Sequence, residues 1–204
     1  MKLHWSPRSP FVRKVMVCAH ETGLAGRIEL VRTVVTMSKP NLELMRDNPV
    51  GRIPTLVTDD GLVLFESALI CEYLDSLHDG PKLFPAPPPA RWEALRWHAL
   101  GEGMLETMIL WRTERLRPEP QRSPEHLSAF ELKIRTSLDV LEREADALAR
   151  TPIAIGHVAI GCALGYIDFR FPEMGWRDRH DRIAGWFATF AARPSMQRTL
   201  PVDE

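Results

Sequence analysis

The stretch from Asn48 to Ser67, NPVGRIPTLVTDDGLVLFES, carries the residues with the clearest chemistry. Glu66 and Ser67 come directly before apolar residues at helical spacing, so Ser67 is expected at a helix N-terminus. Such an end presents unpaired N–H groups and a partial positive charge, which bind a carboxylate or a phosphate. The Glu66 carboxylate suits an ammonium group. This pair therefore predicts a site for a ligand that carries both charges.

The peptide groups of Ile53 are expected to be open to the same ligand. Pro54 has no N–H and restricts Ile53 to extended backbone, so an ordinary central strand does not begin there. A cis Ile53–Pro54 bond is the expected alternative, because it costs only about 0.5–1 kcal/mol for an X–Pro pair. The kink would leave the Ile53 N–H and C=O free for an extended chain. Together with the two charge sites, this favours a small zwitterionic peptide as the ligand.

Short strands and one helix must position these residues in the first part of the chain. Thr55–Val57 and Leu62–Phe65 are two predicted strands, joined by an Asp-Gly hairpin turn. Lys2–Trp5 and Ile28–Val31 are two more. Apolar residues at helical spacing after Ser9-Pro10 predict a helix with Ser9 as its N-cap.

The second part of the chain contains only helical patterns. A proline-rich segment over residues 80–89 separates it from the first part and predicts a semi-rigid linker. The expected domains are therefore residues 1–79 and residues 90–204. Amphipathic or buried helices are expected around residues 92–111, 130–148, 153–167 and 183–192.

Three motifs resemble those of the cytosolic glutathione S-transferase family. NPxGxIPxLV, an acidic hairpin and ESxxIxEYL resemble its glutathione-binding core, SPRSPFVRKV resembles the first loop and helix of bacterial members, and IGCALGYIDFRFP resembles the sixth helix. The resemblance implies an α/β thioredoxin-like N-terminal domain, an all-α C-terminal domain and a homodimer. It also implies glutathione as co-substrate, attacking a small apolar electrophile.

Serine-type members of this family use a hydroxyl in the first loop to stabilise the glutathione thiolate, and the resemblance assigns that role to Ser9. Ser6 is the runner-up. The loop has no tyrosine, and Pro10 replaces the cysteine of cysteine-type relatives. Assistance is needed because a free thiol has a pKa of about 8.5 and is mostly protonated at neutral pH.

The resemblance also implies which residues of this chain would contact each part of glutathione. Lys39, or Asn41 behind it, would meet the glycyl carboxylate, and Arg52 would either contact the ligand or face water. Ile53 would pair with the cysteinyl part, Pro54 would hold the cis turn, and Glu66 and Ser67 would hold the γ-glutamyl end. Met108 and Trp111 are candidates for the electrophile pocket, with the core or a dimer interface as their other interpretation.

The sixth helix departs from the family pattern at its start. Relatives have Ser or Thr followed three residues later by an acid, which form a capping box. The matching residues here are Ala154 and His157. We therefore expect another group to satisfy the N–H donors, and His157 to be structural.

Composition argues against several other classes of protein. With 26 basic and 27 acidic residues the formal charge is −1, so no strong attraction to nucleic acid or to an anionic membrane is expected. No apolar run approaches the ~18 residues of a membrane span, no signal peptide is visible, and a cytoplasmic location is expected. The three dispersed cysteines are expected to be buried, and no metal or phosphate-loop motif is present. Two alternatives stay open: a non-catalytic protein that binds a partner, or a glutathione-dependent peroxidase, dehalogenase or isomerase.

Overall fold

The computed structural model describes residues 1–203, which form two compact units. Unit 1 consists of Met1–Pro85 together with the C-terminal segment from Pro194 onward, and unit 2 is Ala86–Arg193. The division at a linker over residues 80–89 stays a prediction. Helix α4 (Pro88–Arg115) begins within that span, because proline is well tolerated in the first turn of a helix.

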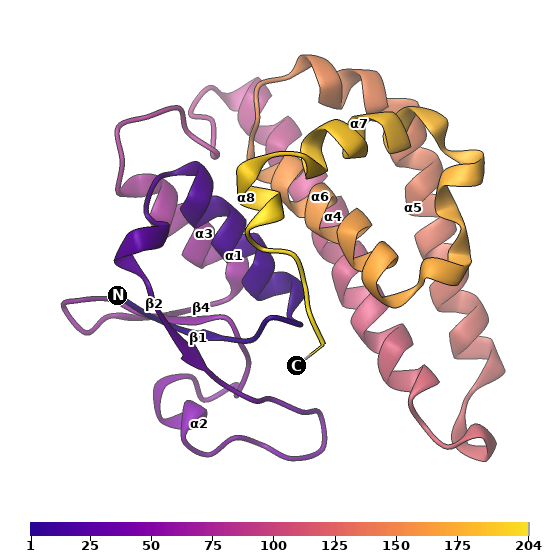
Figure 1. The fold of residues 1–204 in the computed structure, drawn as a ribbon, viewed down its shortest axis with the longest axis horizontal. Helices are drawn as coiled ribbons and strands as arrows, with labels where there is room; N and C mark the ends of the chain where they lie inside the picture. The colour runs from indigo at the N-terminus through magenta and orange to yellow at the C-terminus, as the bar shows by residue number, and fades with distance from the viewer. Residues whose placement is uncertain (204) are drawn as a thin grey trace. The chain divides into compact units, whose positions relative to one another are not determined.

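Unit 1 is built on a four-stranded mixed sheet, as expected. Its strands are β1 (Lys2–Trp5), β2 (Glu29–Arg32), β3 (Thr55–Val57) and β4 (Val63–Phe65), in the order β2-β1-β3-β4. Strand β1 is parallel to β2 and antiparallel to β3, which is antiparallel to β4. Helices α1 (Pro10–Glu21) and α3 (Ser67–Ser76) lie on one face of the sheet, and α2 (Leu44–Asp47) lies on the other (Figure 1). The short helix α8 (Pro194–Gln197) contacts α1, and a 3-10 turn spans Ala25–Arg27.

The core of unit 1 lies on the face of the sheet that α1 and α3 cover. Leu3 and Leu56 pair across β1 and β3, and both are fully buried. Val15 of α1 and Ile70 of α3 are also fully buried. These residues follow from the period-2 and helical patterns of the sequence, which put the apolar side chains of each element on one side.

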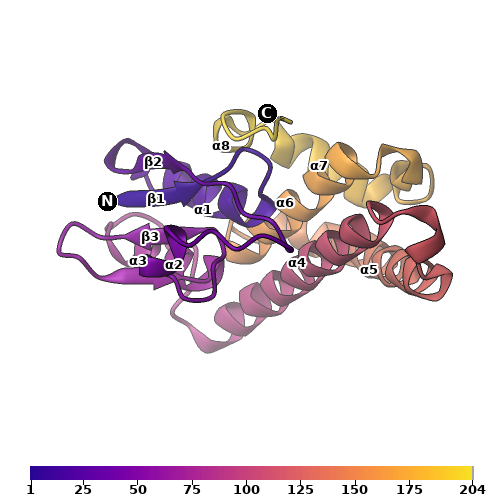
Figure 2. The same ribbon diagram turned by 90° about the horizontal axis from the view of Figure 1, so that it is seen from below.

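Unit 2 is all helical, as expected. It contains α4, α5 (Pro124–Arg150), α6 (Ile155–Arg170) and α7 (Asp181–Ala191), with 3-10 turns at Glu119–Gln121, Pro172–Met174 and Trp176–Arg179. Figure 2 shows α4 side-on, along its whole length. Helices α4 and α5 run antiparallel, since Arg96 and Trp97 near the start of α4 bond to Glu144 near the end of α5, at 2.7 and 2.6 Å.

Two glycines allow α4 and α6 to pack closely. A Cβ on Gly101 of α4 would lie 2.6 Å from the carbonyl carbon of Ala159, and one on Gly156 of α6 would lie 2.5 Å from the Cβ of Trp97. Both distances are too short for any side chain. Glycine inside a helix is unfavourable by roughly 0.5–1 kcal/mol relative to alanine. Here it allows the two backbones to approach each other.

The expected buried state of the cysteines is confirmed, since Cys18, Cys71 and Cys162 are all buried free thiols. Within residues 1–203, no helix has both the length and the apolar character needed to cross a membrane.

Helix α6 begins with half a capping box. Ala154 is the N-cap and has no side-chain acceptor to offer, but the Nδ1 atom of His157 accepts from the Ala154 N–H at 3.1 Å. An acceptor at Nδ1 requires the proton on Nε2, which donates to the Leu148 carbonyl at 3.1 Å. Burial lowers the pKa of His157, while its bond to the Leu148 carbonyl acts in the opposite direction. The neutral imidazole therefore has a structural role here.

We expect the stability of unit 2 to fall in acid because of His157. An unfolded histidine has a pKa of about 6.5, and the folded pKa is lower. The contribution is therefore fully present above about pH 6.5 and is lost as the pH falls from there toward the folded pKa, by about 1.4 kcal/mol for each unit between the two values. His157→Gln should reduce this loss between pH 7.5 and about pH 5.5.

Urea unfolding followed by tryptophan fluorescence checks this prediction, since Trp92, Trp97, Trp111, Trp176 and Trp186 all lie in unit 2. His126→Gln, at an exposed position of α5, is the matched control and should keep the wild-type pH dependence. Equal losses in wild type and His157→Gln would contradict the assignment.

Candidate functional site

The register of the sheet brings the predicted site residues to one end of unit 1. His4 of β1 pairs with Thr55 of β3, and Thr55 pairs with Phe65 of β4. Because β3 runs opposite to its two neighbours, the chain leaves β1, enters β3 and leaves β4 at this same end. The loop after β1, the turn before β3 and the start of α3 therefore meet there. The loop after β2 leaves from this end too, since Trp5 pairs with Arg32 in the parallel ladder.

Ser9 lies at the N-terminus of α1, as predicted. Its Oγ accepts the Val12 N–H at 3.3 Å, and Pro10 occupies the first turn of the helix. A hydroxyl that accepts one bond keeps its own hydrogen to donate. No group within residues 1–203 takes that hydrogen, and the first turn of α1 contains no acid. Ser9 can therefore donate to an anion beside the positive end of the helix dipole.

Ser6 lies at the other end of the same four-residue turn. Its carbonyl accepts the Ser9 N–H at 3.2 Å, and the residue is only 9% exposed. It stays the runner-up for the same role.

The Ile53–Pro54 peptide bond is cis, as predicted. The ladder between β1 and β3 ends at Thr55, so the peptide groups of Ile53 lie beyond it. Across residues 1–203 neither group makes a backbone hydrogen bond. The turn thus presents a donor and an acceptor without backbone partners, as a peptide ligand requires.

Asn48 holds this turn, a role that the sequence did not predict. Its side chain is almost fully buried, donates to the Arg52 carbonyl and to Thr55 Oγ1, both at 3.0 Å, and accepts the Val50 N–H at 3.0 Å. Asn before Pro is a signal for a turn, but nothing local indicates that its amide reaches seven residues onward to Thr55.

Glu66 has an uncommon backbone conformation, with φ at +78°, and it is the N-cap of α3. A residue other than glycine in this region is unfavourable by roughly 1–3 kcal/mol and often marks a functional site. Its carboxylate accepts the Ser67 N–H at 2.9 Å and lies 3.4 Å from Ser67 Oγ. The helix N-terminus predicted at Ser67 is present, and the Glu66 carboxylate accepts its N–H group. The binding of a ligand anion there stays a prediction.

Two exposed cations lie in the loops at this end. Lys39 follows β2, and Arg52 precedes the cis bond. Neither side chain forms an ion pair with any group in residues 1–203. Asn41, the runner-up to Lys39, instead fixes the loop: its amide donates to Val34 O and accepts the N–H groups of Glu43 and Leu44, all at 3.1 Å. Both cations are therefore available to a ligand carboxylate.

Met108 and Trp111 are buried in unit 2. Met108 is fully buried, and Trp111 stacks on Phe171 with ring centroids 4.5 Å apart. Their contact with an electrophile stays a prediction. Within residues 1–203 no three His, Cys, Asp or Glu side chains are grouped so that they could hold a metal ion.

Comparisons with known proteins identify the family. Residues 8–77 match the model of the glutathione S-transferase N-terminal domain, and residues 124–189 match that of the C-terminal domain. An Escherichia coli (strain K12) protein named "Uncharacterized GST-like protein YibF" is 31% identical over 98% of both chains. A stringent starvation protein A homolog of Pasteurella multocida is 41% identical over 40% of this chain and 36% of its own length.

A solved structure of a glutathione transferase family member from Pseudomonas fluorescens Pf-5, with bound glutathione, is similar along its whole length. It is 40% identical, the match covers 99% of each chain, and the TM-score is 0.95. With both domain models matched and full-length likeness in sequence and structure, the chain belongs to the glutathione S-transferase family.

Proposed function

We propose that this protein is a glutathione transferase that activates the glutathione thiol for attack on a small apolar electrophile. The observation that carries the proposal is the meeting of Ser9, the Ile53 peptide and Glu66-Ser67 at one end of the sheet. Glutathione bound to the similar Pseudomonas fluorescens protein supports the choice of ligand.

Each part of glutathione has a matching group. The peptide groups of Ile53 pair with the cysteinyl part, and the γ-glutamyl carboxylate takes the Ser67 N–H and hydroxyl. Glu66, displaced from that N–H, then faces the γ-glutamyl ammonium. Lys39 and Arg52 lie in the loops nearby and are free to meet the glycyl carboxylate, so both ends of the peptide are recognised by charge.

The reaction starts from the thiolate. The Ser9 hydroxyl and the positive end of α1 favour the anion, so a larger share of the thiol is ionised at neutral pH. The sulfur donates an electron pair to the electrophilic carbon and a C–S bond forms. Either a leaving group departs with its bonding pair, or the carbon skeleton accepts the pair and then a proton. Met108 and Trp111 are proposed to contact the apolar electrophile.

Two other functions use the same site. The Pasteurella multocida relative is named as a stringent starvation protein A homolog and not as a transferase. This name is the reason to keep the partner-binding alternative. Glutathione binding without a lowered thiol pKa would support that alternative. A lowered pKa without conjugation of model electrophiles would support a peroxidase, dehalogenase or isomerase. The three buried free thiols suit a reducing compartment, in keeping with a cytoplasmic location.

Removing the Ser9 hydroxyl should raise the pKa of bound glutathione. If Ser9 lowers that pKa by about two units, Ser9→Ala loses roughly 2.7 kcal/mol of thiolate stabilisation, and turnover at neutral pH falls accordingly. The ultraviolet thiolate band of bound glutathione, followed across pH, measures the shift. Because Ser9 is also an N-cap, the matched control is Ser123→Ala, which removes the cap of α5. A shift lost in Ser6→Ala but kept in Ser9→Ala would transfer the role to Ser6.

Ser67→Ala should weaken glutathione binding by about 1–3 kcal/mol, because a buried hydrogen bond to the γ-glutamyl carboxylate is lost. Calorimetric titration measures this change. Ser76→Ala, at the other end of α3, removes only a bond to the Tyr73 carbonyl and should leave the affinity unaltered. Equal affinities in both variants would count against the assignment.

We also propose a homodimer that uses the β4 edge of unit 1. Phe65 of this edge strand, Leu62 just before it and Leu69 in the first turn of the following helix α3 are 38%, 51% and 48% exposed. Large exposed apolar side chains gathered at a sheet edge indicate an interaction surface.

A charge placed in this surface should separate the subunits. Leu69→Arg should shift the protein toward the monomer in sedimentation experiments, since burying an unpaired charge in the interface is unfavourable. Leu200→Arg, at a 56% exposed position away from β4, is the control and should sediment like wild type. A dimer that persists in Leu69→Arg would place the interface elsewhere.

A further inference from the structure

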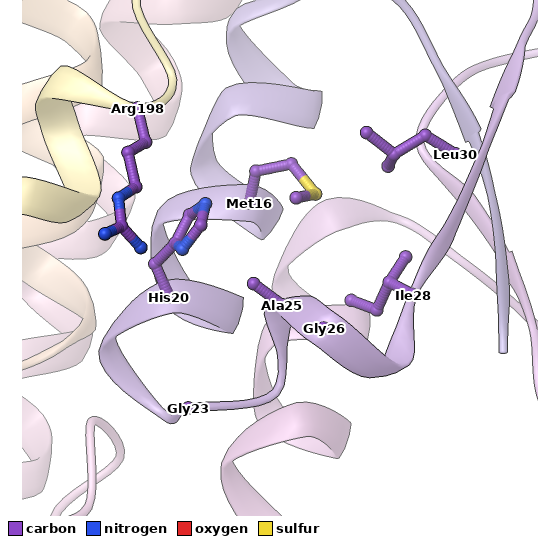
Figure 3. Close-up of a pocket in the computed structure, with 8 residues that line it drawn as sticks. All are labelled: Met16, His20, Gly23, Ala25, Gly26, Ile28, Leu30 and Arg198. Carbon is purple, nitrogen blue, oxygen red and sulfur yellow. The ribbon is translucent and has the colours of Figure 1, made fainter.

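A second hollow in unit 1 lies away from the candidate glutathione site. Its volume is about 510 Å³, and it is formed by the C-terminal half of α1, the 3-10 turn, the start of β2 and Arg198 (Figure 3). That volume lies within the range of about 300–1,000 Å³ that is common for small-molecule sites. It is therefore large enough for a ligand of its own.

The hollow lies at the opposite end of the sheet from Ser9. Helix α1 begins beside Ser9 and ends at Glu21, and the start of β2 pairs with the start of β1. Ligands at the two ends would not share a contact residue. The hollow belongs to neither the proposed thiol site nor the proposed electrophile pocket.

One side of the hollow is lined by polar side chains and the other side by apolar ones. His20 and Arg198 lie next to each other on one side, and Met16, Ile28 and Leu30 lie on the other (Figure 3). Leu30 is 43% exposed although it belongs to a strand, so part of the apolar side is open to solvent.

The two polar side chains are available for binding. Throughout residues 1–203, neither the His20 imidazole nor the Arg198 guanidinium has a hydrogen bond or an ion pair within the protein. Burial lowers the pKa of His20, and the charge of Arg198 acts in the same direction, while the charge of Glu21 opposes it. The lining residues from the turn and from β2 carry no charge. A bound anion would thus meet a permanent cation and an imidazole that can become one.

We infer that this hollow binds a small amphipathic anion, a carboxylate with an unbranched apolar tail. The carboxylate would lie between Arg198 and His20, and the tail would cover Met16, Ile28 and Leu30. The charge of Arg198 supplies the attraction, since a guanidinium matches a carboxylate with two parallel N–H bonds. The apolar tail removes the exposed part of Leu30 from water.

Sodium octanoate is the probe, with acetate and octan-1-ol as matched controls for its head and its tail. Calorimetry should give one octanoate site per chain and affinities at least about tenfold weaker for both controls, because each lacks one half of the interaction. NMR should show the Met16 methyl and the His20 ring perturbed together. The pKa of His20 should rise on octanoate binding, because a neighbouring anion favours the imidazolium.

Variants then locate the site. Arg198→Gln should weaken octanoate binding by about tenfold or more, and His20→Gln should abolish the titrating NMR signal. Arg179→Gln, at an exposed position of unit 2, is the matched control and should bind like wild type. Unchanged affinity in Arg198→Gln would overturn the inference, and so would octanoate binding that saturating glutathione abolishes. Neither result depends on the role of Ser9. The octanoate proposal and the proposed role of Ser9 can therefore be disproved independently of each other.

Discussion

The pairing of Thr55 with His4 on one side and Phe65 on the other is the constraint on which the candidate site depends. Strand β3 has only three residues, and a slip of one residue would turn every side chain to the other face of the sheet. Its start is fixed by the buried Asn48 side chain, which bonds to Thr55 Oγ1 and to the Arg52 carbonyl. The position of the cis bond relative to Ser9 and Glu66 is therefore set by a residue that need not touch any ligand.

In the proposed function, Glu66 would make the Ser67 end of the candidate site selective for a zwitterion. Its carboxylate takes the Ser67 N–H, so the positive end of α3 is already neutralised in the free protein. A simple anion that binds there must displace the Glu66 carboxylate and leave it unpaired beside a like charge, which is unfavourable. A ligand with an adjacent ammonium group takes over both charges at once. Glu66 makes this contact with the Ser67 N–H from a backbone with positive φ, and the surrounding fold compensates for the roughly 1–3 kcal/mol of strain.

Short sequence patterns predicted those features that depend only on neighbouring residues in the chain. Ser-Pro before an apolar helix predicted the cap at Ser9, and the Asp-Gly pair predicted the hairpin between β3 and β4. The positive φ of Glu66 and the bond from Asn48 to Thr55 were not predicted. Both arise only when the chain has folded, the first at the end of a sheet strand and the second across the cis turn, so the neighbouring residues carry no signal for them. The same reason explains why α8 was not expected beside α1. At α6 the sequence indicated a missing cap, but only the structure shows His157 replacing half of it.

Helix α1 contributes to both the thiol site and the second hollow, and its length keeps them electrostatically apart. The C-terminal segment is tied to the helix by Arg13, which donates to the Met196 carbonyl at 3.3 Å, and by Ser195, which donates to Glu21. These bonds place Arg198 beside His20. With 12 residues, α1 is about 18 Å long, which exceeds the Debye length of about 8 Å at physiological salt. The charge of Arg198 is thus largely screened from Ser9. In the proposed reaction the Ser9 hydroxyl and the helix terminus, rather than this distant cation, would favour the glutathione thiolate.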